Sequence, residues 1–337
     1  MSMVRGMSIF RGFSQPVWIG LVVASLALLP LATTANTTLN FLTFVMIVTL
    51  AAQGWNLLAG YGGQFSFGHA AFFGMGAYAM ALLQVRFGVN AWAALPLAMA
   101  LGAGVGFALG FLSFRAELRG SYFALVTLAF AEVFRILANA SSFTGGAAGI
   151  LVPLRAEAAN FQFADRRMFY WVALAFVACA LAITYRISRT RFGAELVAVR
   201  ENEEAARALG VNALAVKLKA ITLSGAITAT AGCLYTQKFL YIDANIAFGP
   251  WISVEALLAP IIGGVGTVLG PLAGAILLLG LGEVTKTAFA IWLGGAIPGV
   301  DLVVFGVLLI LCVAFAPAGV MGAIRRLTAR AKPTGRA

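Results

Sequence analysis

Apolar residues fill long runs of this chain, and these runs determine its predicted architecture. Most of them approach the length of about 20 residues that crosses the hydrocarbon core of a bilayer. The eighth run is too short to cross alone, so it predicts a broken or re-entrant helix. The pattern predicts an all-α fold, a polytopic transmembrane helical bundle with about eight to ten spans. The ten segments are 16–35, 38–59, 66–85, 91–114, 120–138, 168–187, 217–237, 251–263, 266–283 and 297–316.

One long polar passage interrupts these runs, from Arg186 to Lys219. We therefore divide the chain into a cytoplasmic N-terminus (1–15), a transmembrane domain (16–316) and a basic cytoplasmic tail (317–337). The polar passage predicts a cytoplasmic loop at 188–216 within the transmembrane domain. The first apolar run reaches spanning length, which favours an uncleaved first helix over a signal peptide.

The distribution of basic residues predicts which side of the membrane each loop occupies. With the amino terminus inside, the inside segments carry sixteen Lys and Arg residues and the outside segments carry six. Inside loops of membrane proteins are enriched in these residues, so this orientation is favoured.

The composition agrees with an integral membrane protein. The chain is 61% hydrophobic and 10% charged, whereas soluble domains have roughly 25% charged residues. The net charge of +11 lies in short loops and at the termini rather than on one face of a soluble fold, which argues against a nucleic-acid partner. Cys179, Cys233 and Cys312 lie in apolar runs and predict no disulfide framework and no metal site.

The polar loop contains the signals of a short helix. Asn202 is a good N-cap, two acidic residues follow in the first turn, and Gly210 suits the left-handed residue that ends a helix. A helix of about two turns is marginal alone in water and needs a surface to dock on. Ala205, Ala206 and Leu209 provide a small apolar face for such a contact. A solvated connector between two spans is the alternative.

Two charged residues lie within the fifth apolar segment, Glu132 and Arg135. A charge is costly inside a membrane, so both must face protein or water. They are three residues apart on one helical face and can pair with each other. A structural ion pair and a position on a solute path are both consistent with this spacing.

A second polar patch surrounds the single histidine. It comprises Gln53, Asn56, Gln64, Ser66 and His69. A neutral histidine with one donor and one acceptor can hold a bent helix in place, and this role is favoured over contact with a solute. No catalytic pairing of the histidine with an acid, no phosphate-binding loop and no dinucleotide fingerprint is complete, so we expect no enzyme activity.

Glycines four residues apart indicate close helix packing. Gly102, Gly106 and Gly110 form such a stripe in the fourth segment, and Gly266, Gly270 and Gly274 form another in the ninth. Each stripe predicts a helix face that another backbone approaches closely.

Recognisable motifs occur in the segments 60–64, 66–74, 122–135, 144–149, 200–210 and 263–275. Together they resemble the Liv-type branched-chain amino-acid permeases of bacterial ABC importers, and the likeness covers roughly residues 41–322. Residues 204–206 with Gly210 also resemble the coupling motif of importer permeases, although Ser224 stands where many members have proline. The residues implied to contact an ATPase are Arg191, Gly193, Asn202, Glu203, Glu204, Ala205, Ala206, Leu209 and Gly210.

The resemblance implies a transport subunit in the bacterial inner membrane. Its expected partners are two cytoplasmic ATPase subunits, a second related permease, a periplasmic substrate-binding protein and membrane lipid. The chain itself would bind no cofactor, because ATP and magnesium would be held by the ATPase subunits. Import of urea, short amides or other small solutes by the same architecture is an alternative, and a self-sufficient channel or ion-coupled carrier is another.

Overall fold

The computed structural model describes residues 15–32, 35–155 and 157–293, with 299, 303, 305–307, 310 and 318–322 beyond them. The predicted N-terminus (1–15), the basic tail (317–337) and the tenth apolar segment (297–316) therefore lie largely outside the described residues.

Helices make up almost all of the described chain, as predicted. Short 3₁₀ turns lie at Ser142–Thr144 (η3), Gly146–Ala148 (η4) and Ala158–Asn160 (η5). The α-helices are α1 (Gln15–Ala32), α2 (Asn36–Trp55), α3 (His69–Val85), α4 (Ala91–Arg115), α5 (Gly120–Ala140), α6 (Arg166–Ser188), α7 (Arg191–Glu201), α8 (Glu203–Ala208), α9 (Ala213–Phe239), α10 (Ala244–Phe248), α11 (Pro250–Gly263) and α12 (Gly270–Leu293).

Within the described residues, seven helical stretches are long and apolar enough to cross a membrane. They are α2 with its continuation to Tyr61, then α4, α5, α6, α9, the pair α10–α11 and α12. Two further apolar helices, α1 and α3, are near the lower limit of about 17 residues for a span. The predicted polytopic bundle is therefore confirmed.

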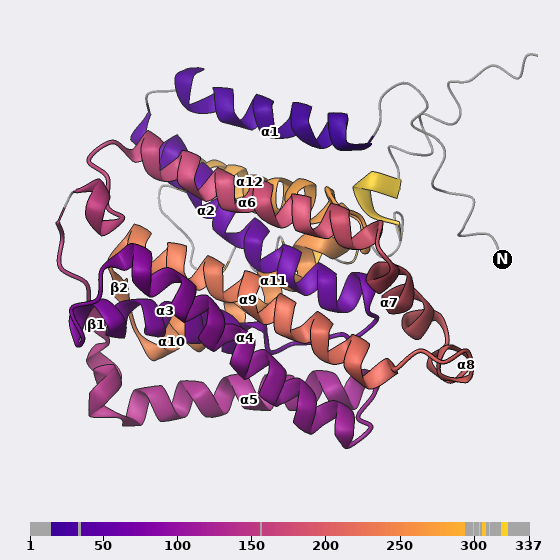
Figure 1. Ribbon diagram of the computed structural model, residues 1–337. Helices are drawn as coiled ribbons and strands as arrows, with labels where there is room; N and C mark the ends of the chain where they lie inside the picture. The colour runs from indigo at the N-terminus through magenta and orange to yellow at the C-terminus, as the bar shows by residue number, and fades with distance from the viewer. Residues whose placement is uncertain are drawn as a thin grey trace, which may run out of the picture.

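The two ends of the bundle differ in structure (Figure 1). At one end, α7 and α8 project beyond the long helices. At the other, β1 (Ile150–Leu151) pairs with β2 (Tyr241–Ile242) in an antiparallel register that sets Ile150 opposite Ile242. The polar loop and this strand pair therefore lie at opposite ends of the molecule.

Close packing around α9 explains the first glycine stripe. A Cβ placed on Gly102 would lie 2.3 Å from Ala229 Cβ, and one on Gly106 would lie 2.7 Å from the Ile221 carbonyl oxygen. On α9 itself, a Cβ on Gly225 would lie 2.6 Å from the Gly102 carbonyl oxygen. The contact between α4 and α9 therefore depends on glycine residues on both helices, as the spacing predicted for α4.

The second stripe is confirmed only in part. Gly270 and Gly274 lie in α12, and a Cβ on Gly274 would lie 1.7 Å from the Ala259 carbonyl oxygen of α11. Gly266 instead lies in the turn before the helix with a φ of +72°, a conformation that glycine adopts readily. The predicted helix at 266–283 therefore begins four residues later than expected.

Two membrane helices are interrupted. The end of α2 widens into a π-helical turn, η2 (Asn56–Tyr61), and the chain is irregular from there until α3 begins. The predicted short segment 251–263 is the second part of a broken helix, because Gly249 is extended between α10 and α11. Pro250 then occupies the first turn of α11, where its missing N–H costs no hydrogen bond. These breaks place non-helical backbone inside the protein, where other groups can satisfy it.

Candidate functional site

The candidate site is the region formed by α7 and α8, which connects α6 to α9. A sharp turn follows α6, and α7 then packs across its end. A Cβ on Gly193 would lie 2.0 Å from the Ile187 carbonyl oxygen, so only glycine permits this approach. Leu196 and Val199 are buried and fix the inner face of α7.

The short helix α8 begins and ends where the sequence predicted. The Oδ1 atom of Asn202 accepts a hydrogen bond of 2.9 Å from the Ala205 N–H, which is the expected N-cap. At the other end Gly210 has a φ of +87°. The Gly210 N–H donates to the Arg207 carbonyl and the Val211 N–H to the Ala206 carbonyl, which together form a Schellman motif. Both ends of a six-residue helix are therefore satisfied within the chain.

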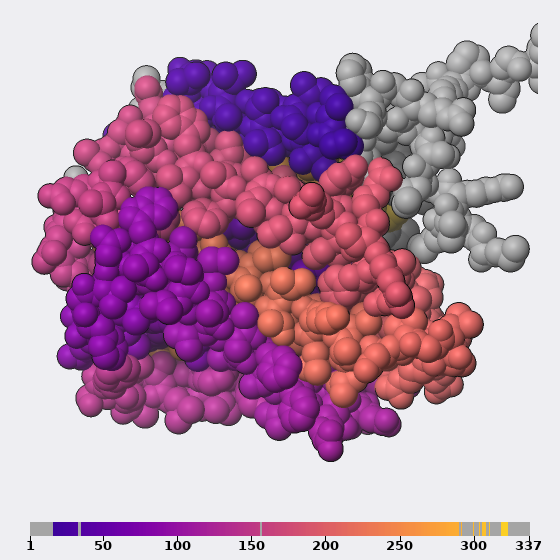
Figure 2. Space-filling model, viewed as in Figure 1, coloured from indigo at the N-terminus to yellow at the C-terminus, as the bar shows by residue number. Residues whose placement is uncertain are grey.

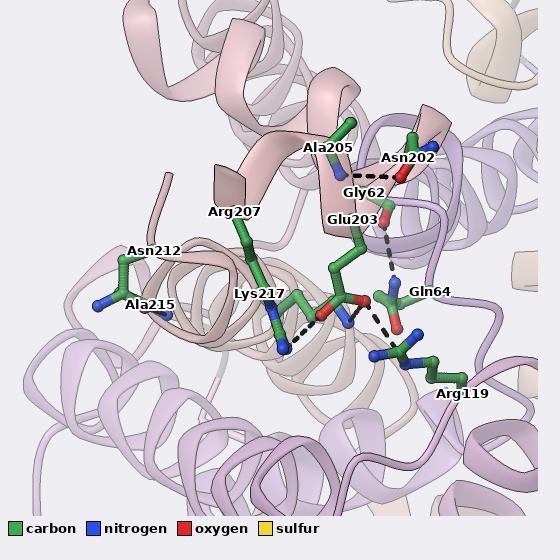
Figure 3. A network of polar contacts seen from close by, with 10 residues as sticks. All are labelled: Gly62, Gln64, Arg119, Asn202, Glu203, Ala205, Arg207, Asn212, Ala215 and Lys217. Atoms are coloured by element: carbon green, nitrogen blue, oxygen red, sulfur yellow. Dashed lines mark hydrogen bonds and ion pairs between the residues drawn. The ribbon is translucent and has the colours of Figure 1, made fainter. Parts of the chain in front are cut away.

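Glu203 anchors α8 to two membrane helices (Figure 3). Its Oε2 atom accepts a hydrogen bond of 2.6 Å from Lys217 Nζ in α9 and lies 3.8 Å from Arg119 Nε, next to the start of α5. Its Oε1 atom accepts a hydrogen bond of 2.6 Å from Arg207 Nη2 in α8. We call Glu203, Lys217, Arg119 and Arg207 the Glu203 clamp.

Two members of the clamp, Glu203 and Lys217, form a largely buried ion pair. The side chains of Glu203 and Lys217 are only 12% and 5% exposed. The Lys217 ammonium also lies 5.5 Å from the ring centroid of Phe114 in α4, a cation–π distance. Burial raises the pKa of Glu203, but the hydrogen bond and charge of Lys217, with the two arginines, lower the pKa further, and the net shift is downward. The carboxylate is therefore ionised at neutral pH.

A second anchor joins α7 to the interrupted end of α2. The Nη1 atom of Arg200 donates a hydrogen bond of 2.6 Å to the Gly60 carbonyl oxygen. A Cβ on Gly63 would lie 2.5 Å from Arg200 Cγ, so the glycine turn provides the space for this side chain. The loop is thus held to α2, α5 and α9 at once and does not behave as a loose connector.

The outer side of α8 combines small or apolar side chains with one acidic residue. Leu209 is 86% exposed, and Glu204, Ala205 and Ala208 are also exposed. Ala206, which we expected on this face, is only 3% exposed and packs against the rest of the chain. The expectation was wrong because Ala206 lies three residues after the inward-facing Glu203, on the same side of the helix.

Arg191 belongs to the exposed surface of α7. Its side chain is 92% exposed, and its Nε atom donates a hydrogen bond of 2.8 Å to Glu195 one turn later. The exposed surface of the candidate site therefore combines a cationic residue on α7 with the apolar side of α8.

Gln53 and Asn56, predicted on a solute path or in a structural patch, are completely buried. Asn56 accepts a hydrogen bond of 2.8 Å from the Gly266 N–H and donates one of 2.9 Å to the Thr267 carbonyl. Gln53 donates one of 2.7 Å to the Val268 carbonyl. Both side chains thus fix the turn before α12 to α2, which is a structural role.

His69 is also buried, with a hydrogen-bond partner at each ring nitrogen. Its Nε2 atom lies 3.0 Å from Ser224 Oγ in α9, and its Nδ1 atom lies 3.2 Å from Ser66 Oγ. The Ser224 hydroxyl donates to the Gly54 carbonyl, so Nε2 is the protonated nitrogen and Nδ1 accepts from Ser66. His69 and Ser66 have no exposed surface in this conformation, and their contact with a solute stays a prediction. Gln64 is half-buried and donates to the Gly62 carbonyl.

Glu132 and Arg135 form the predicted ion pair, and unlike the histidine patch they are exposed. The Nε atom of Arg135 lies 2.9 Å from Glu132 Oε2. Arg135 also bonds to Asn245 at the start of α10. Sequence reasoning missed Asn245, because nothing in the chain pattern brings positions 110 residues apart together.

The anchoring partners of α8 were also missed. Lys217 and Arg119 were counted only as charges of the inner loops. The available signal was the position of Lys217 at the start of the apolar segment 217–237, where a charge requires a partner.

Together these features define a multi-pass membrane protein with a capped helix anchored between two of its spans. The chain belongs to the family described as branched-chain amino acid transport system / permease component, whose model matches residues 37–313.

Known relatives agree with this assignment. The chain is 33% identical over 266 residues to the high-affinity branched-chain amino acid transport permease LivM of Escherichia coli K12, covering 72% of this chain and 62% of that protein. It is 27% identical over 302 residues to the high-affinity branched-chain amino acid transport permease BraD of Pseudomonas aeruginosa. This match covers 84% of this chain and 94% of that protein. It is 31% identical over 136 residues to the autoinducer 2 import permease LsrC of Salmonella choleraesuis, covering 38% of each. The chain thus spans about three fifths of the length of the E. coli relative. No solved structure matches it.

Proposed function

We propose that this chain is the membrane permease subunit of an ATP-driven ABC importer for branched-chain amino acids, and that it forms half of the translocation path. Its partners are a second related permease, two cytoplasmic ATPase subunits that bind ATP and magnesium, and a periplasmic substrate-binding protein. The assembly lies in the bacterial inner membrane. Membership of the permease family and the names of LivM and BraD support this proposal.

In this proposal α8 is the contact through which the ATPase subunits move the permease. The observation that carries it is the contrast between the two sides of the helix. The inner side is fixed to α9 and α5 by the Glu203 clamp, whereas the outer side presents the exposed Leu209. A partner that fills this surface moves α8 as a rigid unit and passes the motion to both membrane helices.

Two substitutions at one position test the docking role. Leu209→Glu places a charge on the outer surface, and Leu209→Met retains an apolar side chain of similar size. Because a buried leucine contributes about 1.5–3 kcal/mol, we expect Leu209→Glu to lower ATP-driven leucine uptake in proteoliposomes by roughly ten-fold or more. The ATPase subunits should also be lost from the purified complex, whereas Leu209→Met should retain both.

The outcomes separate the parts of the proposal. Normal uptake and normal retention of the ATPase subunits in Leu209→Glu would show that α8 is not the docking contact. Leucine uptake by the wild-type chain without ATP would show a channel or an ion-coupled carrier instead.

A different cargo is the second candidate, and the partial match to an autoinducer 2 permease favours considering it. The architecture and the coupling helix would be unchanged, with urea, a short amide or another small solute as the substrate. Calorimetry of the cognate binding protein against leucine, urea and ribose decides between them. Binding of another solute without leucine would replace the branched-chain assignment.

A further inference from the structure

A charged cluster lies on the exposed side of α5. The side chains of Arg135 and Glu132 are 30% and 49% exposed, although both belong to a candidate membrane span. The Nε and Nη2 atoms of Arg135 donate to the two carboxylate oxygens of Glu132, at 2.9 Å and 2.5 Å. Its Nη1 atom donates to Asn245 Oδ1 at 2.7 Å. We call these three residues the α5 cluster.

The depth of the cluster decides what can cover it. Glu132 is eight residues before the end of α5, which corresponds to about 12 Å along the helix axis. That position lies within the hydrocarbon region of a bilayer, where charged side chains do not face lipid. The exposed side of α5 at this level therefore faces water or another protein. Figure 2 shows α5 along the edge of the molecule opposite α1.

The cluster has unused hydrogen-bonding capacity. Arginine carries five N–H donors, and the three bonds above leave two of them for a further partner. The Glu132 carboxylate likewise has lone pairs beyond the two that Arg135 uses. A protein–protein interface that buried this cluster would have to satisfy these groups, whereas a water-filled path does so at no cost.

The chemistry of the face matches a small zwitterion with an apolar tail. The charges of Glu132 and Arg135 cancel, so the cluster favours neither a cation nor an anion. A molecule that carries an ammonium and a carboxylate complements both charges at once. One helical turn to either side, Leu128 and Ile136 are 40% and 54% exposed on the same face of α5, where an apolar side chain can lie.

We propose that the α5 cluster is a station on the translocation path that binds the ammonium and carboxylate of a branched-chain amino acid as it crosses. Arg135 binds the carboxylate and Glu132 binds the ammonium, while Asn245 holds the guanidinium in place. The cluster lies toward the end of the bundle that carries β1 and β2, opposite α8 (Figure 1). This inference rests on the proposed function, because the amino acid is the cargo assigned there.

Thiol labelling of two adjacent positions tests which face of α5 is accessible to water. Cysteine replaces Ile136 or Leu137 in the full complex, with the native cysteines changed to alanine. The two positions are similarly exposed, at 54% and 58%. Leu137 points about 140° around the helix from Glu132, whereas Ile136 is only about 40° away. A charged methanethiosulfonate reagent should therefore modify Ile136→Cys and leave Leu137→Cys unmodified.

The other labelling results would overturn the proposal. Equal labelling of both positions, or labelling of neither, would show that the path does not follow this face. Cross-linking of Ile136→Cys to the second permease would show that the α5 cluster is a subunit contact.

Transport variants test the role of the charges. Glu132→Gln with Arg135→Gln removes both charges, and Glu132→Arg with Arg135→Glu exchanges them and keeps the ion pair. We expect both double variants to lower the maximal leucine uptake rate by about ten-fold or more, as for loss of one charge-assisted hydrogen bond. Stimulation of the ATPase by the loaded binding protein should persist. Recovery of uptake by the exchanged pair would show a structural ion pair and overturn the proposal.

Failure of the cargo assignment gives a different result. If the wild-type complex imports no branched-chain amino acid, the proposed function fails. Labelling of Ile136→Cys still reports whether the face of α5 that carries the cluster is accessible to water. If the wild type and the variant with Glu132→Gln and Arg135→Gln import leucine equally well, the α5 cluster does not bind the amino acid on its path. The proposed function then stands.

Discussion

Removing the negative charge of Glu203 is the sharpest test of how α8 is held. In Glu203→Gln the amide retains a hydrogen-bond acceptor but no longer balances Lys217. The Lys217 side chain is 5% exposed, so its ammonium would become a buried charge without its carboxylate partner. The variant therefore perturbs the attachment of α8 and leaves its caps, Asn202 and Gly210, in place.

The expected magnitude follows from the burial of the pair. Breaking a buried ion pair by removing one partner costs about 3–5 kcal/mol, whereas an exposed pair contributes about 0–1 kcal/mol. Glutamine retains part of the hydrogen bonding, so we take the lower end of the range, about 3 kcal/mol. At about 1.4 kcal/mol per factor of ten, this corresponds to a roughly 150-fold loss of protection against local opening.

Hydrogen exchange of the amides at 206–211 in the purified permease, without its ATPase subunits, measures this opening. We expect exchange there to accelerate by about two orders of magnitude, with little change in the buried amides of α9. Glu204→Gln is the matched control, because it removes the same charge from the exposed neighbouring position. Its effect should remain within a few-fold, about 0.5 kcal/mol.

Equal exchange rates in the two variants would refute the reasoning, since Glu203 is largely buried and paired with Lys217 whereas Glu204 is exposed. A neutral double variant, Glu203→Gln with Lys217→Met, provides a second check. It removes the unbalanced ammonium, so it should recover much of the lost protection. Failure to recover would assign the effect of Glu203→Gln to something other than the buried charge.

Two further predictions concern pH and helix packing. The pKa of Glu203 is lowered on folding, so the stabilisation by the clamp is complete above the ordinary carboxyl pKa of 4.5 and is lost as the pH falls through the lower pKa of the folded state. Exchange at α8, corrected for its intrinsic rate, should therefore be constant at neutral pH and rise only below pH 4.5. Gly102→Ala places a Cβ 2.3 Å from Ala229 Cβ and should destabilise the α4–α9 contact by about 1–3 kcal/mol. Gly104→Ala, which meets nothing within 4 Å, should be neutral or stabilising by up to about 1 kcal/mol; the fraction of protein that remains folded after heating in detergent measures the difference.

Local features of the site could be predicted from the sequence because short-range rules determine them. The N-cap at Asn202 and the left-handed Gly210 depend on the backbone within a few residues, and both are found where the pattern placed them. The Gly102 stripe is a similar case, since its spacing of four already defines one face of a helix. The fold class followed from the length of the apolar runs alone.

Partners distant in the chain could not be predicted. The polar spacing suggested that Asn56 and His69 belonged to one patch, but not that Asn56 binds the turn at Gly266 or that His69 binds Ser224 on α9. The inward face of Ala206 was missed for the same reason. A six-residue helix has no hydrophobic periodicity long enough to show which side is buried, and the direction became evident only once Glu203 was seen to bind Lys217.

The helix α5 connects one member of the Glu203 clamp, Arg119, to two members of the α5 cluster, Glu132 and Arg135. This connection gives the two proposals a common mechanical basis. Arg119, which lies 3.8 Å from Glu203, directly precedes α5, and Arg135 lies about 22 Å further along the same helix. An α-helix transmits an axial or tilting displacement because its backbone hydrogen bonds run along its length. Under the proposed coupling, movement of α8 would displace the end of α5 and change the distance between Arg135 and Asn245, which lies on a different element, α10. In this mechanism the stroke that opens the path also opens the α5 cluster, so the amino acid is released in the same step that moves the helices.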